Sequence, residues 1–301
     1  MPEPFVPNTV LIKDLVDQLI SDSEIVAAAR ASGRASGPIT GLRTLDINLG
    51  GYLFPGLHIL QSATGIGKTA LALQIASMCG FPALFVSTET NILELFRRLI
   101  ARTTKTALER LKSGELSANA IAYLAKQTIE QSPILAIMDA TPCCVSINQI
   151  CEVAISLRDW AGSNRILIVI DSLQFWSRPE IDFGKNIENI ASSVRIASEL
   201  AARLSSPVLA LSHKNRSSID KAQQSSTHPS ALSQAQGGKA FDIEYLAESV
   251  LELSKEKEIK VDLTAAKSSM VLSIRKNRHG SSPVNIPLDF TGQFQLFTEK
   301  G

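Results

Sequence analysis

The stretch that decides the fold is Ser62-Ala-Thr-Gly-Ile-Gly-Lys-Thr69, within a chain of 301 residues. It matches the phosphate-binding pattern GxxxxGK[ST], except that serine stands where the first glycine is usual. An apolar run at 58–62 precedes it, and a segment with helical periodicity follows at 68–79. A strand that turns into a helix through such a loop is the arrangement that binds a nucleoside triphosphate, so the stretch predicts a P-loop ATPase.

Each residue type in the loop has a physical reason to be there. Gly65 and Gly67 permit backbone angles that turn successive N–H groups toward an anion, and the positive end of the following helix faces the same anion. Lys68 is expected to reach the β and γ phosphates of ATP, and the Thr69 hydroxyl to bind Mg²⁺, which prefers oxygen ligands. The full set expected to bind ATP is Ser62, Ala63, Thr64, Gly65, Ile66, Gly67, Lys68, Thr69 and Ala70.

Outward from the loop, apolar runs typical of strands alternate with segments of helical periodicity. Strands are expected at 58–62, 83–87, 134–138, 166–170 and 208–211, and helices at 68–79, 91–102, 117–131, 147–160 and 187–204. This alternation predicts an α/β fold with a mostly parallel sheet covered by helices. Later short strands at 250–253, 271–275, 284–288 and 293–297 predict antiparallel additions at the sheet edge.

The chain begins with a segment of different character. At 9–30, apolar residues at helical spacing predict an amphipathic helix, and the sequence ASGRASGP at 31–38 has the composition of a flexible linker. We therefore expect two parts: an N-terminal helix with its linker at 1–38, and a RecA-like ATPase motor domain at 39–301.

Composition excludes several other classes of protein. The chain is 45% hydrophobic and 20% charged, as expected of a globular protein, and its formal net charge of +1 neither favours nor excludes a polyanionic partner. Its apolar runs are too short for a membrane span, and its N-terminus lacks an export signal, so we expect a cytoplasmic protein without membrane contact. Cys79, Cys143, Cys144 and Cys151 lack CxxC spacing, which favours reduced, buried thiols.

Three polar residues close predicted strands. Asp171 ends the apolar run ILIVI, where a P-loop ATPase needs a carboxylate beside its metal ion, although an Asp at this place can also be a turn or helix cap. Glu89 ends FVSTE and is the candidate general base, with a helix N-cap as the alternative. His213 ends PVLALSH and is the candidate phosphate sensor, while an ordinary turn histidine is an equally good interpretation.

Together these residues resemble the RecA-like motor domain of DnaB-type replicative helicases over about 10–297. The resemblance rests on the P-loop with a non-glycine first position, on VIDSLQ around Asp171, on SHKNR at 212–216 and on DIEYLAESVLEL at 242–253. It implies that Glu89 is the catalytic glutamate, that Asp171 and Thr69 bind Mg²⁺, and that His213 senses phosphate. The chain is also similar to RadA/Sms-type ATPases, but it lacks their zinc motif and protease-like domain.

The KNR sequence at 276–278 matches a K-x-R element of the same family. The resemblance implies that Lys276 and Arg278 reach the nucleotide of a neighbouring subunit in a homo-oligomeric ring, most commonly a hexamer. An arginine in this role stabilises charge on the γ phosphate and is worth roughly 10³ to 10⁵ in rate in related NTPases.

The segment expected to contact DNA departs from the family pattern. It reads SQAQGGKAF at 233–241, where the family often has a D-L-R-x-S-G run. Its basic side chains and paired glycines still suit the phosphates of single-stranded DNA, and the absence of aromatic residues predicts weak sequence preference. A solvated loop without a partner is the alternative. The candidate DNA-binding residues are Lys214, Arg216, Lys221, Gly237, Gly238 and Lys239.

Three functions are compatible with the sequence. The first is an ATP-driven ring helicase that moves along single-stranded DNA, with loader, replication or recombination proteins as further partners. The second is a RadA-like recombination ATPase, and the third is a KaiC-like ring that recruits proteins without moving DNA. Because no domain precedes the first helix, coupling to primase is not expected.

Overall fold

The computed structural model describes residues 12–132, 134–141, 145–176, 186–213, 245–256 and 267–300. The chain divides into two compact units, at 1–36 and 37–301, close to the division expected at 38. In the first unit, η1 (Ile12–Leu15) continues into α1 (Val16–Ala31). The helix is as predicted, but its apolar stripe is short, because Ile25 points about 180° away from Val16 at about 100° per residue.

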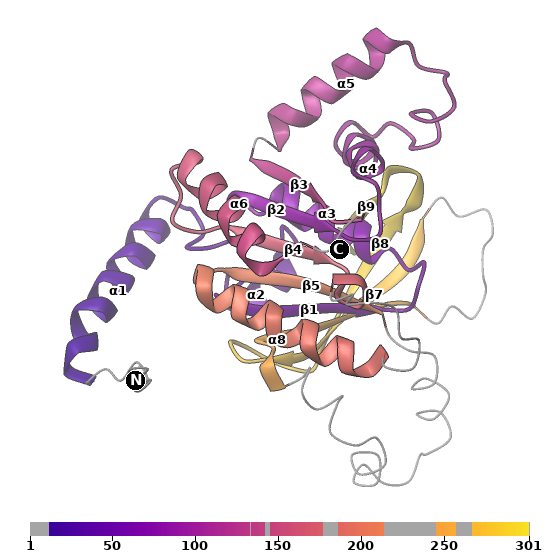
Figure 1. The fold of residues 1–301 in the computed structure, drawn as a ribbon. Coiled ribbons are helices and arrows are strands. Elements are labelled where there is room, and N and C mark those ends of the chain that lie inside the picture. Colours follow the sequence, from indigo (N-terminus) through magenta and orange to yellow (C-terminus); the bar gives the residue numbers. More distant parts are fainter. Residues whose placement is uncertain are drawn as a thin grey trace, which may run out of the picture. The chain divides into compact units, whose positions relative to one another are not determined.

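The second unit is built on one sheet with the strand order β3-β2-β4-β5-β1-β6-β7-β8-β9 among the described residues (Figure 1). The first six strands in this order pair in parallel, and the last three add antiparallel neighbours, as predicted. The bounds are β1 (Gly56–Ser62), β2 (Ala83–Ser87), β3 (Leu135–Asp139), β4 (Leu167–Asp171), β5 (Pro207–His213), β6 (Ser249–Lys255), β7 (Ser268–Asn277), β8 (Val284–Thr291) and β9 (Leu296–Glu299).

Helices cover both faces of this sheet. They are α2 (Arg43–Asn48), α3 (Lys68–Met78), α4 (Ile92–Thr104), α5 (Ala118–Gln131), α6 (Ile147–Trp160), α7 (Leu173–Trp176) and α8 (Asn186–Leu204). In β2, Phe85 packs in one hydrophobic core with α3 and α4, whereas Leu84 and Val86 pack in a second core with α6 and α8. This alternation follows from the two-residue period of a strand and produces three layers.

Local capping sets several helix boundaries. The side chains of Asn91 and Ser117 accept hydrogen bonds from the N–H groups of Leu93 and Ala120, so α4 and α5 each begin one residue later than predicted. One predicted strand, at 293–297, is wrong in its first half. Residues Gly292–Phe294 form the 3₁₀ helix η2, and Gln295 has φ of 52°, which separates this turn from β9.

The register of the parallel strands brings the predicted polar residues to one edge of the sheet. Ser62 at the end of β1 lies opposite His213 at the end of β5. Ser87 at the end of β2 lies opposite Asp171 at the end of β4. The carboxyl ends of these four strands therefore meet at the edge where α3 begins, which is where open α/β sheets bind ligands.

Candidate active site

The P-loop connects β1 to α3 as expected. Gly65 and Gly67 have φ of 78° and 103°, in the left-handed region that favours glycine. Ser62 does not adopt a positive φ, and its hydroxyl donates to the carbonyl of Ala63 at 2.7 Å. Serine therefore fits at the position where the general pattern has glycine, because the backbone there needs no unusual angle and the side chain is turned back onto the loop.

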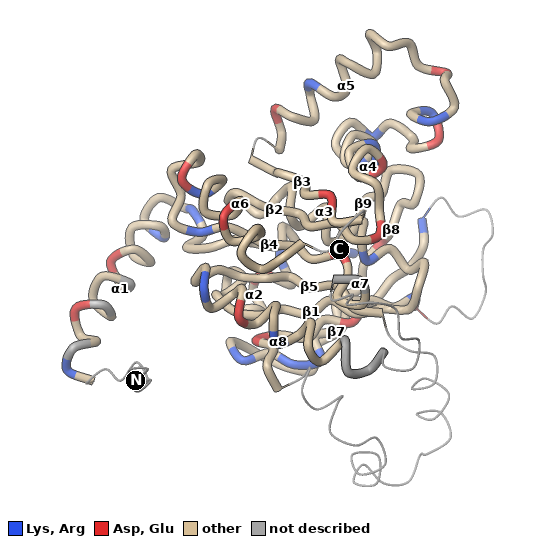
Figure 2. Tube along the Cα trace, in the orientation of Figure 1, with Lys and Arg blue, Asp and Glu red and all other residues tan. Residues whose placement is uncertain are grey.

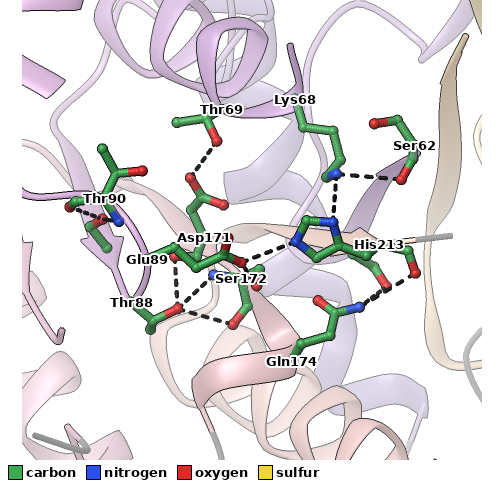
Figure 3. A network of polar contacts seen from close by, with 12 residues as sticks. Ser62, Lys68, Thr69, Thr88, Glu89, Thr90, Asp171, Ser172, Gln174 and His213 are labelled. Atoms are coloured by element: carbon green, nitrogen blue, oxygen red, sulfur yellow. Dashed lines mark hydrogen bonds and ion pairs between the residues drawn. The ribbon is translucent and has the colours of Figure 1, made fainter. Parts of the chain in front are cut away.

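Lys68 begins α3 and is 6% exposed. Its Nζ lies 3.4 Å from the carbonyl oxygen of Ser62 and 3.2 Å from Nδ1 of His213 (Figure 3). Burial lowers the pKa of Lys68, and the negative charges of Asp171 and Glu89 partly offset this effect. An ammonium group can only donate, so a charged Lys68 makes Nδ1 of His213 the acceptor.

This assignment fixes the proton of His213 on Nε2. That atom lies 3.1 Å from Oε1 of Glu89, so His213 donates to the carboxylate. His213 therefore bridges Lys68 and Glu89, and the structure places the three predicted residues in one hydrogen-bonded chain. The imidazole is held by the site, which argues against an ordinary turn histidine.

Thr69 and Asp171 form a second pair beside this chain. Oγ1 of Thr69 donates to Oδ2 of Asp171 at 2.8 Å, and Asp171 is 3% exposed. Burial raises the pKa of Asp171 to about 6; Glu89 adds to the rise, while Thr69 and Lys68 oppose it. The negative charge of Asp171 is therefore incompletely balanced. Two adjacent oxygen donors with surplus negative charge fit Mg²⁺, which takes its remaining ligands from phosphate and water.

Glu89 is positioned by side chains that the sequence interpretation did not single out. Burial disfavours its charged form, but hydrogen bonds from His213 and Ser172 outweigh burial and lower its pKa. Thr88 fixes the backbone next to Glu89, since its N–H and hydroxyl both donate to the carbonyl of Asp171, at 2.7 and 2.9 Å. The N-cap of the following helix is Asn91, so Glu89 does not have that role.

The carboxylate of Glu89 is thus ionised and about 30% exposed, as a group that accepts a proton from water must be. Gln174 completes the site from α7, with Nε2 donating to Oγ of Ser212 at 3.0 Å. Gln174 lies in the VIDSLQ sequence, whose extra polar residues were the available signal for both Gln174 and Ser172.

The predicted basic pair lies at the opposite edge of the sheet. His58 in β1 pairs with Ser249, which in turn pairs with Asn277, so the end of β7 is level with the start of β1. The P-loop follows Ser62, four residues further along β1, or roughly 13 Å at about 3.3 Å per residue. Lys276 and Arg278 therefore face away from the phosphate loop of their own chain.

The remaining predictions have mixed outcomes. Lys214, Arg216, Lys221, Gly237, Gly238 and Lys239 lie outside the described residues, as do Cys143 and Cys144. Cys79 and Cys151 are buried free thiols, as expected, and burial raises the pKa of Cys79 to about 11. Basic and acidic residues are interspersed along the described chain (Figure 2). Within that part of the chain, no helix has the length and apolar character that a membrane crossing requires.

The sheet order, the P-loop before α3 and the polar strand ends define a RecA-like P-loop α/β domain. Residues 37–299 match the family model described as DnaB-like helicase C terminal domain, so the chain belongs to that family. The resemblance inferred from the motifs is confirmed.

Relatives and solved structures agree with this assignment. The chain is 27% identical to the replicative DNA helicase DnaB of Treponema pallidum over 96% of this chain and 62% of that protein. It is 26% identical to DnaB of Geobacillus stearothermophilus over 68% of this chain and 45% of that protein. The chain thus spans about half to three fifths of the length of these relatives.

Among solved structures, a DnaB-like replicative helicase superposes with a TM-score of 0.70 at 21% identity, covering 97% of this chain and 67% of that one. A separate ATPase domain gives a TM-score of 0.74 at 21% identity, covering 95% of this chain and 99% of that one. A KaiC-like protein from Pyrococcus horikoshii OT3 gives a TM-score of 0.54 at 16% identity, covering 87% of this chain and 98% of that one. At these identities the likeness shows the fold alone.

Proposed function

We propose that this chain is the motor subunit of a ring-forming DNA helicase, which hydrolyses ATP with Mg²⁺ and moves along single-stranded DNA. The observation that carries the proposal is the division of catalytic groups between two edges of one sheet. Lys68, Asp171 and Glu89 lie at the edge that carries the P-loop, whereas Arg278 lies at the other. Such a chain supplies half of one nucleotide site and half of the next.

Within one chain, the loop N–H groups and Lys68 bind the phosphates of ATP. Thr69 and Asp171 hold Mg²⁺, which when bound neutralises phosphate charge. Glu89 orients the attacking water and accepts its proton. His213, which bridges Lys68 and Glu89, exchanges its bond with Lys68 for one with the γ phosphate and so reports that ATP is present.

Between chains, Lys276 and Arg278 of one subunit approach the nucleotide held by its neighbour. This assignment is supported by their position, since the register places them roughly 13 Å along the strand from their own P-loop. A closed ring, most simply a hexamer, gives every P-loop a neighbour. The segment that includes Lys214 and Lys239 is the proposed contact with DNA phosphates, and the proposed location is the cytoplasm.

The family match favours this function over the two alternatives. A RadA-like recombination ATPase would act on branched DNA, and a KaiC-like ring would recruit proteins without DNA. The KaiC-like structure shares the fold, but residues 37–299 match the DnaB-like helicase model. Loader and replication proteins are proposed partners on the same family grounds.

One pair of measurements on the purified chain tests the proposal. With ATP and Mg²⁺, native mass measurement should give a closed oligomer, and single-stranded DNA should raise the rate of ATP turnover. A monomer under these conditions contradicts the shared site. Turnover that is unchanged by DNA, together with ATP-dependent capture of a protein partner, selects the KaiC-like function instead.

A further inference from the structure

The edge of the sheet with the basic pair contains a second polar cluster, centred on the carboxylate of Glu248. Oε1 of Glu248 accepts from Nη1 of Arg278 at 3.0 Å, and Oε2 lies 2.9 Å from Nε2 of His279. The N–H of Arg278 also donates to the carbonyl of Glu248 at 3.0 Å. One residue therefore holds two consecutive residues at the end of β7 through both side chain and backbone.

Glu248 is itself fixed by the start of β1. Its N–H donates to the carbonyl of Leu57 at 2.7 Å, and its side chain lies against the bare backbone of Gly56. A Cβ at Gly56, where φ is 139°, would lie only 2.4 Å from Cγ of Glu248, so glycine is needed there. Its partner His279 stacks on Phe54 with ring centroids 4.0 Å apart. Only 17% of the Glu248 side chain is exposed.

Arg278 combines a fixed position with access to solvent. Nη2 donates to the carbonyl of Tyr245 at 2.7 Å, so Tyr245 and Glu248 hold both terminal nitrogens of the guanidinium. The side chain nevertheless remains 45% exposed. A planar guanidinium carries five N–H donors, and these two contacts occupy one terminal nitrogen each. The group can therefore meet an anion while its orientation is set from behind.

We propose that Glu248 is the positioning residue for the basic pair: it orients Arg278 toward the nucleotide of the neighbouring subunit. This inference rests on the proposed function, in which Arg278 acts between subunits. Glu248 touches no nucleotide and acts through Arg278. Misplacing a catalytic group by about 1 Å can cost on the order of 10²-fold in rate, so a fixed orientation is worth having.

The test compares Glu248→Gln with a matched control on the same strand, Glu252→Gln. Glu252 accepts from Nε of Arg275 at 2.8 Å and is 12% exposed, so it makes a similar ion pair without contact to Arg278. Glu248→Gln should lower kcat for ATP about 10-fold to 100-fold and change KM less than about twofold. Glu252→Gln should leave kcat within about twofold of the wild type.

The double variant Glu248→Gln/Arg278→Ala shows whether the two residues act together. It should turn over within about twofold of Arg278→Ala alone, because Glu248 has no other route to the reaction. Fully multiplicative losses, or equal losses in Glu248→Gln and Glu252→Gln, overturn the proposal. If Glu248→Gln does not fold, Glu248→Asp retains the charge on a shorter side chain, and a kcat equal to that of the wild type then overturns it.

These results also separate the inference from the function beneath it. Wild-type turnover in Arg278→Ala contradicts the action of Arg278 between subunits. A large loss in Arg278→Ala beside wild-type turnover in Glu248→Gln contradicts only the positioning role of Glu248.

Discussion

The substitution Asp171→Asn is expected to make the nucleotide-free protein more stable while it abolishes turnover. Asp171 is almost fully buried, and burial raises the pKa of its carboxyl from 3.8 to about 6. At pH 7 the charged form therefore costs the folded state about 3 kcal/mol, from about 1.36 kcal/mol for each pKa unit. Asparagine removes this charge and keeps an oxygen that can accept from Thr69.

The sign of the effect gives it a characteristic pH dependence. Because the pKa of Asp171 is raised in the folded state, the folded state binds the extra proton between about pH 6 and pH 3.8. The wild type should therefore lose stability relative to Asp171→Asn as pH rises through this window. The stability difference should be absent below about pH 4 and reach about 3 kcal/mol above pH 6.

Urea unfolding of both proteins with EDTA and without nucleotide measures this difference. Asp139→Asn is the control, because Asp139 ends the adjacent strand at the same level as Asp171, opposite Ser87. Hydrogen bonds from Thr141 lower the pKa of Asp139, so this variant should lose rather than gain stability at pH 7. The reasoning is refuted if Asp171→Asn is less stable than the wild type at pH 7, or if the difference does not vary with pH.

Three further predictions concern other residues. Glu89→Gln should bind ATP with little change in affinity but turn over about 10² to 10⁴ times more slowly, as measured by nucleotide binding and phosphate release; normal turnover excludes Glu89 as the base. Burial lowers the pKa of His58 to about 4, so wild-type stability from this residue should fall by about 3 kcal/mol between pH 6.5 and pH 4, and His58→Gln should show a shallower loss in urea titrations; equal slopes contradict this. A Cβ at Gly280 would lie 2.1 Å from the carbonyl oxygen of Asn48, so Gly280→Ala should cost about 1 to 3 kcal/mol in urea unfolding, whereas Gly292→Ala should cost less; equal costs would show that the close contact is unimportant.

Much of the fold follows from local pattern. Asp171 closes an apolar strand and Lys68 opens a helix after a glycine-rich loop, and both facts are visible in short stretches of sequence. Parallel pairing then brings strand ends together without knowledge of side-chain packing, which is why Glu89, Asp171 and His213 could be predicted to meet.

Other parts of the site depend on contacts between segments distant in sequence. Ser172 and Gln174 gain their roles from how α7 packs beside β2 and β5, which periodicity does not encode. The contact of Glu248 with Arg278 spans thirty residues and needs the bare backbone of Gly56, and a single sequence shows only a glycine at a strand start. The strand predicted at 293–297 was wrong because Gln295 adopts a left-handed conformation that favours glycine and that its residue type does not signal.

The most direct test of the shared site is the mixing of two inactive variants, Lys68→Ala and Arg278→Ala. Each should be nearly inactive alone, because every site in either ring lacks one essential group. In mixed rings, some interfaces combine an intact P-loop with an intact Arg278 from the neighbour, so ATP turnover should recover to a fraction of the wild-type rate that depends on the mixing ratio. If mass measurement shows that mixed rings form and turnover stays at the level of the separate variants, Lys68 and Arg278 do not serve the same site from different subunits.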